Sequence, residues 1–341
     1  MNRITSLNGI RFIFALLVFV CHWYIIISCD YFRFSISYVG GKSVIFFFCL
    51  SGFFVGLKYK DEFDNISLKS YFSFIKKHFL KGYLLYVLTT IPFLIRLILE
   101  GKSLANIFVK LFLNVFCIQS LVPYKTSISI NSVAWFTSCL FLLYIVSPFI
   151  IIFINKFLKY KTSKIIVLLI SIALSVLLSN FDKLYITPYY RVWQFVIGII
   201  TAYLLSNVSQ DNFINNSSNI NILEIIAFVL CVFFTIFPIT EIVSYIFTLL
   251  SDIVLISVLF YSRNGIISKL FSSKILNYLG DLSGNIYLIH FPVVALLGGL
   301  LKPYFVNSFG SSIVLGIILF LITLVISIIY KYLFEKLIKE K

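Results

Sequence analysis

Long apolar runs separated by short polar segments dominate the chain. A transmembrane helix needs about 20 predominantly apolar residues to cross the hydrocarbon core of a bilayer. Ten windows meet this requirement, at 7–28, 40–58, 74–97, 132–154, 164–180, 190–206, 221–238, 242–261, 280–301 and 310–334. An eleventh apolar stretch, 104–122, is a weaker candidate. The pattern predicts an all-α fold, a polytopic transmembrane helix bundle of about ten spans.

Basic residues between these runs predict how the chain is oriented. Loops on the cytoplasmic side of a membrane carry an excess of Lys and Arg. With the N-terminus in the cytoplasm, the lysine-rich region 58–81 lies on the same side after two spans. The lysine cluster at 156–164 joins it only if 104–122 does not cross the membrane. We therefore predict ten spans, an extra re-entrant or interfacial segment at 104–122, and both termini in the cytoplasm.

Composition agrees with the membrane class. The 341 residues are 60% hydrophobic and 12% charged, with a mean hydropathy of +1.03, whereas soluble domains are about 45–50% apolar and about a quarter charged. We expect residues 1–341 to form a single integral membrane domain. The net charge of +15 lies mostly between the apolar runs, where it meets lipid headgroups, so no nucleic-acid partner is expected. The six cysteines lack metal-ligand spacing, and no metal is expected.

Two polar residues of the first predicted span share one helix face. Arg11 and His22 are 11 residues apart, and a rotation of about 1100° is within about 20° of three full turns. Their axial separation is about 16 Å, roughly half of the hydrocarbon thickness. Arg11 alone could be a snorkelling anchor, and His22 alone could be a packing residue. Their shared face favours a functional pair.

A second polar stripe lies near the end of the chain. Spacings of four and three residues place Ser283, Tyr287 and His290 on one helix face. This stripe is either part of a site or an interhelical hydrogen-bond patch. Asp252 is the carboxylate that we place in mid-span, and nothing local indicates its partner. Asp281 follows a glycine and has the sequence context of a helix N-cap.

Five sequence elements follow one another over residues 7–290. In chain order they are Leu7-Asn-Gly-Ile-Arg11 with His22, Phe46-Phe-Phe-Cys-Leu-Ser51-Gly52-Phe53, Trp135-Phe136 with Tyr144 and Pro148, Arg191 with Phe195 and Gly198, and Leu279-Gly280-Asp281-Leu282-Ser283 with Tyr287 and His290. In these residues and spacings the chain resembles the membrane acyltransferase 3 family, which O-acylates cell-surface polysaccharides and other extracytoplasmic acceptors. Its Ser51-Gly52 step would also let another helix or a ligand approach closely.

The chain departs from the family pattern at three places. The third span has His78-Phe-Leu-Lys81 where the family has two arginines separated by two residues, so a phosphate clamp would be less bidentate. Leu140 stands where a glutamate often follows the tryptophan, and Gly284 stands where a tyrosine follows the serine.

The resemblance implies an acyl-CoA donor, by default acetyl-CoA, used from the cytoplasmic side of a bacterial plasma membrane. The acceptor would be a hydroxyl of an extracytoplasmic or lipid-linked carbohydrate. We hypothesise that His22 is the general base and that Arg11 and His290 complete the catalytic set. The residues expected to bind CoA are Arg11, Lys77, His78 and Lys81, and those expected to bind substrate are Ser51, Trp135, Arg191, Ser283 and Tyr287.

Two other functional classes remain open from the residues alone. Intramembrane His, Arg and Asp residues also suit the proton relay of a permease, or a flippase for a lipid-linked sugar. Such a transporter often has inverted repeats with Gly- or Pro-interrupted helices, and we find no matching halves. A polysaccharide polymerase would favour a long loop with clustered arginines, and 97–131 has no such cluster. We expect an acyltransferase, whose acceptor and acyl group the sequence does not identify.

Overall fold

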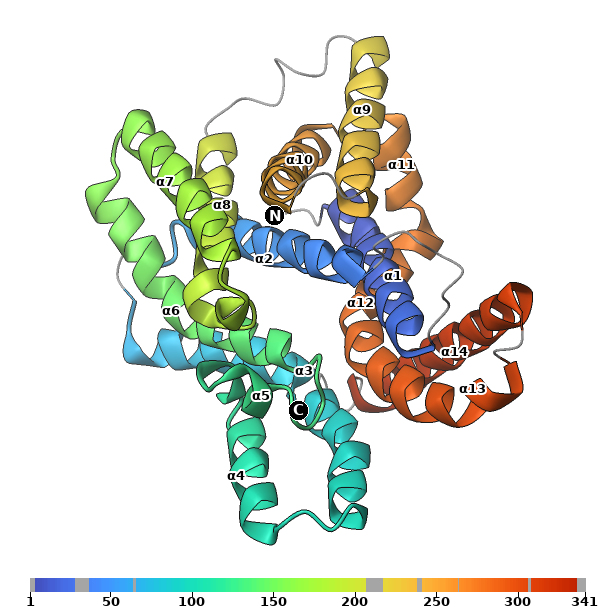
Figure 1. Ribbon diagram of the computed structural model, residues 1–341. Helices are drawn as coiled ribbons and strands as arrows, with labels where there is room; N and C mark the ends of the chain where they lie inside the picture. Colours follow the sequence, from blue (N-terminus) through green and yellow to red (C-terminus); the bar gives the residue numbers. More distant parts are fainter. Residues whose placement is uncertain are drawn as a thin grey trace.

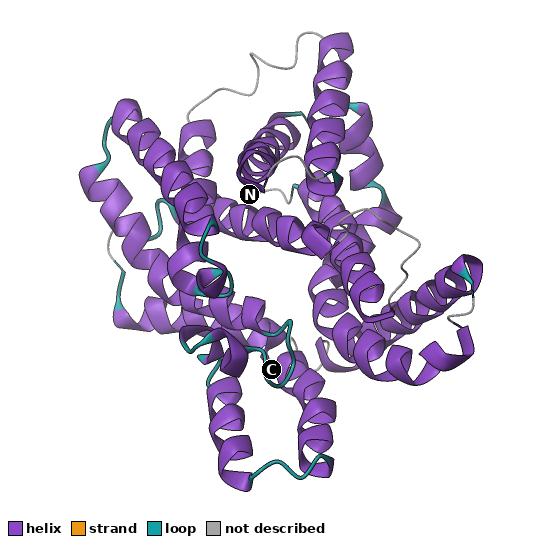
Figure 2. Cartoon of the chain, viewed as in Figure 1, coloured by secondary structure: helices purple, strands orange, loops and turns teal. Residues whose placement is uncertain are grey.

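The computed structural model describes residues 4–27, 37–63, 66–206, 217–237, 241–262, 264–305 and 308–335, and every regular element in these ranges is a helix (Figures 1 and 2). Lipid offers no hydrogen bonds to main-chain N–H and C=O groups, so a spanning segment satisfies them within its own helix. The longer helices are α1 (Thr5–Ile27), α2 (Ser37–Tyr59), α3 (Leu68–Leu99), α4 (Leu104–Val115), α6 (Trp135–Phe157), α7 (Lys161–Ser179), α8 (Pro188–Ser206), α9 (Ser217–Ile236), α10 (Glu241–Tyr261), α12 (Lys274–Pro292) and α14 (Phe309–Tyr330). The shorter ones are α5 (Tyr124–Ser127), α11 (Ile266–Ser272) and α13 (Gly299–Phe305).

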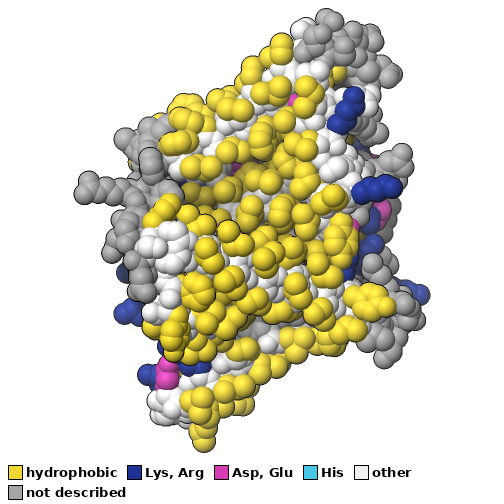
Figure 3. All heavy atoms as spheres, turned by 90° about the vertical axis from the view of Figure 1, so that its right-hand side faces the viewer, with side chains coloured by type: hydrophobic (Ala, Val, Ile, Leu, Met, Phe, Trp, Pro, Cys, Tyr) yellow, Lys and Arg dark blue, Asp and Glu magenta, His cyan; other side chains and the backbone are white. Residues whose placement is uncertain are grey.

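Nine helical stretches in the described ranges are long and apolar enough to cross a membrane. They are formed by α1, α2, the second half of α3, α6, α7, α9, α10, α12 with its continuation into α13, and α14. Figure 3 shows one face of the molecule as a broad field of hydrophobic side chains with Lys and Arg at its margins. The protein is therefore a multi-pass membrane protein, and the predicted polytopic helix bundle is confirmed.

The predicted span 190–206 corresponds to α8, which is not among these nine. Its polar side chains explain the difference, because Arg191 and Gln194 are fully buried and 12 of its 19 residues are buried in the protein. The helix packs along α2 and α7. A helix that protein shields from lipid does not need an apolar surface. We count α8 as the tenth helix of the bundle.

The segment 104–122 does not cross the bundle. Its helix α4 has 12 residues, which is about 18 Å and too short for the hydrocarbon core. The chain turns after it at Cys117, whose φ of 53° is left-handed. Gln119 and Ser120 then pack on the start of α6, through Gln119 Nε2 to Ala134 O at 3.3 Å and Ser120 Oγ to Ser138 Oγ at 2.9 Å. This geometry agrees with the prediction that 104–122 is a re-entrant or interfacial segment and not a span.

Glycines let the central helices touch backbone to backbone. A Cβ on Gly52 of α2 would lie 1.9 Å from Phe195 O of α8, and a Cβ on Gly198 of α8 would lie 1.9 Å from Cys49 O of α2. On α12, a Cβ on Gly280 would lie 2.0 Å from Asn8 O of α1. Small residues allow this close approach of helices in lipid, where packing replaces the hydrophobic effect. The crossings hold α1, α2, α8 and α12 together at the centre of the bundle (Figure 1).

A buried carboxylate joins α9 to α11. Glu224 is fully buried and accepts hydrogen bonds from the main-chain N–H groups of Ile267 at 2.8 Å and Ser268 at 3.0 Å, and from the hydroxyl of Ser262. On the same helix, Asn221 Oδ1 accepts from Ile266 N at 3.0 Å. These groups satisfy the first N–H donors of α11, which have no partner within their own helix. The carboxylate also complements the positive end of that helix.

Replacing Glu224 with alanine is expected to lower the thermal unfolding midpoint of the purified protein. Each buried donor left without a partner destabilises the fold by about 1–3 kcal/mol. The matched control is Glu100→Ala, which removes an exposed carboxylate paired with Arg96 at 2.7 Å. Exposed pairs of this kind contribute about 0–1 kcal/mol. Equal midpoints for the two variants in one detergent would contradict the structural role of Glu224.

Candidate active site

A cavity of about 410 Å³ opens among α1, α2, α3, α6 and α12. Its volume lies within the range of about 300–1,000 Å³ typical of small-molecule sites. The polar residues that line it are Arg11, Ser51, Lys58, Tyr59, Lys77, His78, Tyr83, Cys117, Thr137, Tyr144, Asp281, Ser283, Asn285 and Tyr287. The structure thus brings together six predicted site residues from four helices: Arg11, Ser51, Lys77, His78, Ser283 and Tyr287. The side chain of Lys81 lies outside the described residues.

Cationic side chains from three helices line this cavity. Arg11 of α1, Lys58 of α2 and Lys77 of α3 all line it. Lys58 was not predicted from the sequence as a site residue. Lys58 lies seven residues after Ser51, which places both on one face of α2, and that spacing could have revealed it. Cations from three helices in one place suit an anionic ligand such as a phosphate.

Asp281 lines the same cavity and corrects one prediction. It is not an N-cap, because α12 begins at Lys274, seven residues before Asp281. Its side chain accepts a hydrogen bond from Asn8 Nδ2 at 3.0 Å and pairs with Lys331 at 3.6 Å. Asn8 Oδ1 in turn lies 3.5 Å from Arg11 Nη1. The carboxylate therefore helps to position Arg11 through Asn8 and does not cap the start of a helix.

The two histidines predicted to be catalytic meet in the structure, although 268 residues separate them in the sequence. His22 Nδ1 lies 3.3 Å from His290 Nε2, and the ring centroids are 5.0 Å apart. His22 is partly buried on α1, whereas His290 is fully buried on α12. After Pro292, which has no N–H, the α-helix gives way to a π-helical turn, Val293–Gly298.

Hydrogen bonding assigns a role to each ring nitrogen of this pair. His22 Nδ1 lies 2.9 Å from Val18 O, and His290 Nδ1 lies 3.2 Å from Ile286 O. A carbonyl oxygen only accepts, so each Nδ1 carries the proton in the neutral ring. His290 Nε2 is then an acceptor toward His22 Nδ1–H. His22 Nε2 keeps its lone pair, and in the described part of the chain it has no hydrogen-bond partner. This tautomer presents a basic nitrogen on His22.

The hydroxyl groups between the cations and the histidines differ in their bonding. Tyr287 OH donates to Val133 O at 3.2 Å, which fixes its ring. Ser283 Oγ is buried and has no hydrogen-bond partner among the described residues. A buried polar group without a partner calls for an explanation, and a ligand bound in the cavity would supply one.

Cys117 is the one thiol that lines the cavity in the described ranges. Burial raises the pKa of its side chain to about 12. The thiolate is the reactive form of cysteine, so at neutral pH this group is a poor nucleophile. The arrangement does not favour an acyl-cysteine intermediate.

Trp135 and Arg191, two predicted substrate-binding residues, lie together but do not line the cavity. The guanidinium carbon of Arg191 is 4.4 Å from the ring centroid of Tyr185 and 5.2 Å from that of Trp135. Arg191 Nε donates to Tyr185 O at 2.9 Å, and Nη1 donates to Gln194 Oε1 at 3.0 Å. Aromatic faces stabilise a buried cation of this kind. The substrate-binding role of both residues stays a prediction.

Asp252 also lies away from the cavity. It is fully buried on α10 and accepts a hydrogen bond from Cys231 Sγ at 3.1 Å. Its other oxygen has no hydrogen-bond partner in the described ranges. Nothing local in the sequence indicated its partner, and in the structure the partner is this thiol of α9.

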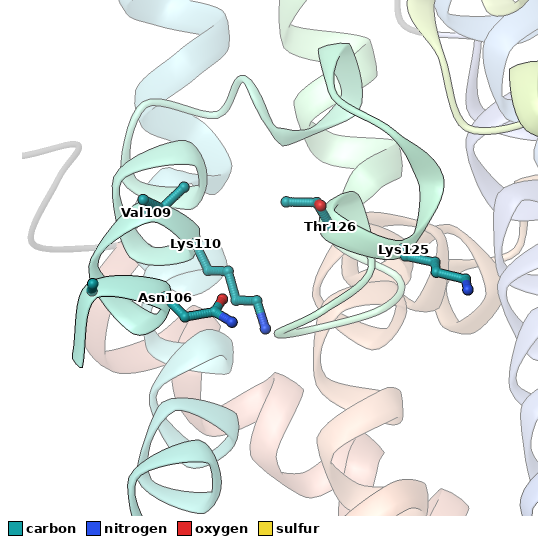
Figure 4. Close-up of a pocket in the computed structure, with 6 residues that line it drawn as sticks. Asn106, Val109, Lys110, Lys125 and Thr126 are labelled. Atoms are coloured by element: carbon teal, nitrogen blue, oxygen red, sulfur yellow. The ribbon is translucent and has the colours of Figure 1, made fainter. Parts of the chain in front are cut away.

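A second, more open hollow of about 550 Å³ lies between α4 and α5 (Figure 4). Its polar side chains are Asn106, Lys110, Lys125 and Thr126. None of the predicted site residues lines it. The cavity beside the histidine pair is the better candidate for an active site because it combines enclosure, cations and hydroxyl groups.

Comparison with known proteins gives one match. A family model described as an acyltransferase domain matches residues 4–332, which is nearly the whole chain. No curated protein and no solved structure matches the chain.

Proposed function

The chain belongs to the membrane acyltransferase 3 family, and on this basis we propose that it moves an acyl group, most simply acetyl, from acyl-CoA to a hydroxyl of a carbohydrate. The carbohydrate is extracytoplasmic or linked to lipid. The enzyme lies in the plasma membrane of a bacterium with both termini in the cytoplasm. The single observation that carries the proposal is the contact of His22 with His290 beside a cation-lined cavity.

The donor side of the proposal rests on the cations of the cavity. CoA carries several phosphate groups, and Arg11, Lys58 and Lys77 can bind them by charge-assisted hydrogen bonds. Asn8 orients the guanidinium of Arg11 from the neighbouring turn of α1. His78 adds a ring that contacts Tyr144, with centroids 4.6 Å apart. The pantetheine arm would then run along the cavity toward Ser283 and the histidines.

The chemical step uses His22 as general base. Its Nε2 takes the proton of the acceptor hydroxyl while the hydroxyl oxygen attacks the thioester carbonyl carbon. The C–S bond then breaks, and the leaving thiolate takes the proton back from His22 to give CoA and the ester. His290 acts through His22 and is a positioning residue, because its Nε2 accepts from His22 Nδ1–H and stabilises the imidazolium. These reaction steps need no covalent acyl-enzyme intermediate.

The direct test is transfer of label from radiolabelled acetyl-CoA in membranes that contain the wild-type protein. Membranes that contain an equal amount of the His22→Ala variant are the control. We expect label to enter a glycan fraction with the wild type only. No transfer from a panel of acyl-CoAs to a panel of envelope glycans would overturn the proposal and favour the transporter, for which flux of a lipid-linked sugar would then be measured.

Replacing Lys77 with alanine is expected to raise the KM for acetyl-CoA by about tenfold, with a smaller effect on kcat. The substitution removes a cation that would contact a CoA phosphate in both the ground state and the transition state, so binding weakens uniformly. Lys76→Ala is the matched control, because this neighbouring lysine is exposed and does not line the cavity. Equal KM values for the two variants would exclude Lys77 from the CoA site.

A further inference from the structure

Three aromatic rings from three helices meet at one point of the cavity wall. They are Phe47 of α2, Phe136 of α6 and Tyr287 of α12, and we call them the aromatic septum. The ring centroids are 4.7 Å apart for Phe136 and Tyr287, 6.0 Å for Phe47 and Phe136, and 6.5 Å for Phe47 and Tyr287. Contacts at these distances are typical of packed aromatic groups.

The aromatic septum lies between the cavity and the histidine pair. All three rings line the cavity, whereas neither His22 nor His290 does. The ring of Tyr287 is 5.7 Å from that of His290, so the histidine pair lies directly behind Tyr287. Along α2, Phe47 of the septum and the cation Lys58 are 11 residues apart, which is about 16 Å along the axis. The cavity thus has a charged end and an aromatic end.

The rings of the septum are held firmly in place. Tyr287 is anchored by its hydrogen bond to Val133 O at 3.2 Å. Phe136 also packs edge-on against Phe48, with centroids 4.9 Å apart. The exposed fractions of Phe47, Phe136 and Tyr287 are 7%, 9% and 4%. A wall of well-packed rings resists displacement by a ligand, because close-packed interiors yield little to added volume.

We infer that the aromatic septum limits the acyl group to a short chain, an inference that rests on the proposed function. With the CoA phosphates on Arg11, Lys58 and Lys77, the acyl end of the donor points toward the septum. A short acyl group lets the thioester carbonyl approach the septum, where the acceptor can reach it from the side of His22. Each added methylene meets the rings and holds the carbonyl farther from His22. The septum therefore selects small acyl groups by excluding longer ones.

Phe136 is the best position to test this inference. It contacts both other rings of the septum, and its removal opens space beside Tyr287 without deleting the hydroxyl of that residue. Phe141 is the matched control, because it lines the same cavity, packs on Phe79 with centroids 4.3 Å apart, and is not part of the septum. Truncation of Phe141 should change the affinity for all acyl-CoAs by the same factor.

The experiment measures the dissociation constants of acetyl-CoA, butyryl-CoA and hexanoyl-CoA by calorimetry, with the full-length protein in lipid nanodiscs. For the wild type we expect acetyl-CoA to bind most tightly and hexanoyl-CoA most weakly. For Phe136→Ala we expect the order to reverse, with a gain of about fourfold for each methylene that enters the new space. For Phe141→Ala the order of the wild type should persist. If Phe136→Ala does not fold, Phe136→Leu takes its place, and its ratio of hexanoyl-CoA to acetyl-CoA affinity is compared with that of the wild type.

The outcomes distinguish failure of the proposed function from failure of the role assigned to the septum. A wild-type protein that binds none of the three acyl-CoAs would overturn the proposed function itself. A wild-type protein that binds acetyl-CoA, with the same ratio of hexanoyl-CoA to acetyl-CoA affinity as the Phe136 variant, would overturn the role of the septum alone. Equal affinity of the wild type for all three chain lengths would do the same.

Discussion

Replacing His22 with alanine is expected to lower the rate of acyl transfer by about 10²–10⁴-fold, the usual contribution of a general base. His22 is the partly buried member of the histidine pair, and its Nε2 is the nitrogen that hydrogen bonding leaves with a lone pair. It does not line the cavity, so acetyl-CoA binding should be unchanged. The measurement is kcat for transfer, together with the dissociation constant of acetyl-CoA, in nanodiscs with equal amounts of folded protein.

Variants of His290 separate a positioning role from simple packing. Glutamine at this position offers an oxygen that accepts from His22 Nδ1–H, whereas leucine of similar size offers none. We therefore expect His290→Gln to retain more activity than His290→Leu, even though both fill the site. Equal activity of these two variants would show that the contact of 3.3 Å between the rings does not matter for catalysis. Full activity of His22→Ala would exclude the proposed base.

Replacing Gly52 with alanine is expected to disrupt the bundle far more than its small size suggests. The new Cβ would lie 1.9 Å from Phe195 O, a main-chain atom of a buried helix that cannot swing away. Gly198 makes the reciprocal contact with Cys49 O. The two helices therefore cannot move apart at Gly52 without also losing the contact at Gly198. Overpacking of a core costs about 1–3 kcal/mol, and occasionally more; valine at this position should prevent stable assembly.

The readout for Gly52 is the thermal midpoint and the monodispersity of the purified protein. Gly82→Ala is the matched control, because a Cβ on this mid-helix glycine of α3 meets nothing within 4 Å. In the interior of a helix, alanine is favoured over glycine by about 0.5–1 kcal/mol. The control should therefore be as stable as the wild type or slightly more stable. A Gly52→Ala protein that matches this control would contradict the close contact of α2 with α8.

Local features of the site followed from the sequence. The shared face of Arg11 and His22, and the stripe of Ser283, Tyr287 and His290, depend only on the regular rotation of an α-helix. Predictions that needed a helix boundary were weaker. Asp281 was expected to cap a helix, but α12 begins seven residues earlier at Lys274, because tertiary contacts extend the helix beyond its glycine. Glu224 was missed as a cap, since the helix that it caps is 43 residues away.

By itself, the sequence determined that this protein is a helical membrane bundle, because lipid forces every span to satisfy its backbone within one long apolar helix. The basic residues around 104–122 indicated that this stretch does not cross the membrane, and the 12-residue length of α4 in the structure agrees with this. The tertiary structure alone decided that His22 meets His290 across 268 residues, that Lys58 joins Arg11 in the cavity, and that Arg191 lies among aromatic rings outside it. Which residues meet across helices depends on which helix faces pack together. The glycines at the crossings decide this packing through close contacts with a second helix. One helix sequence alone does not reveal that second helix.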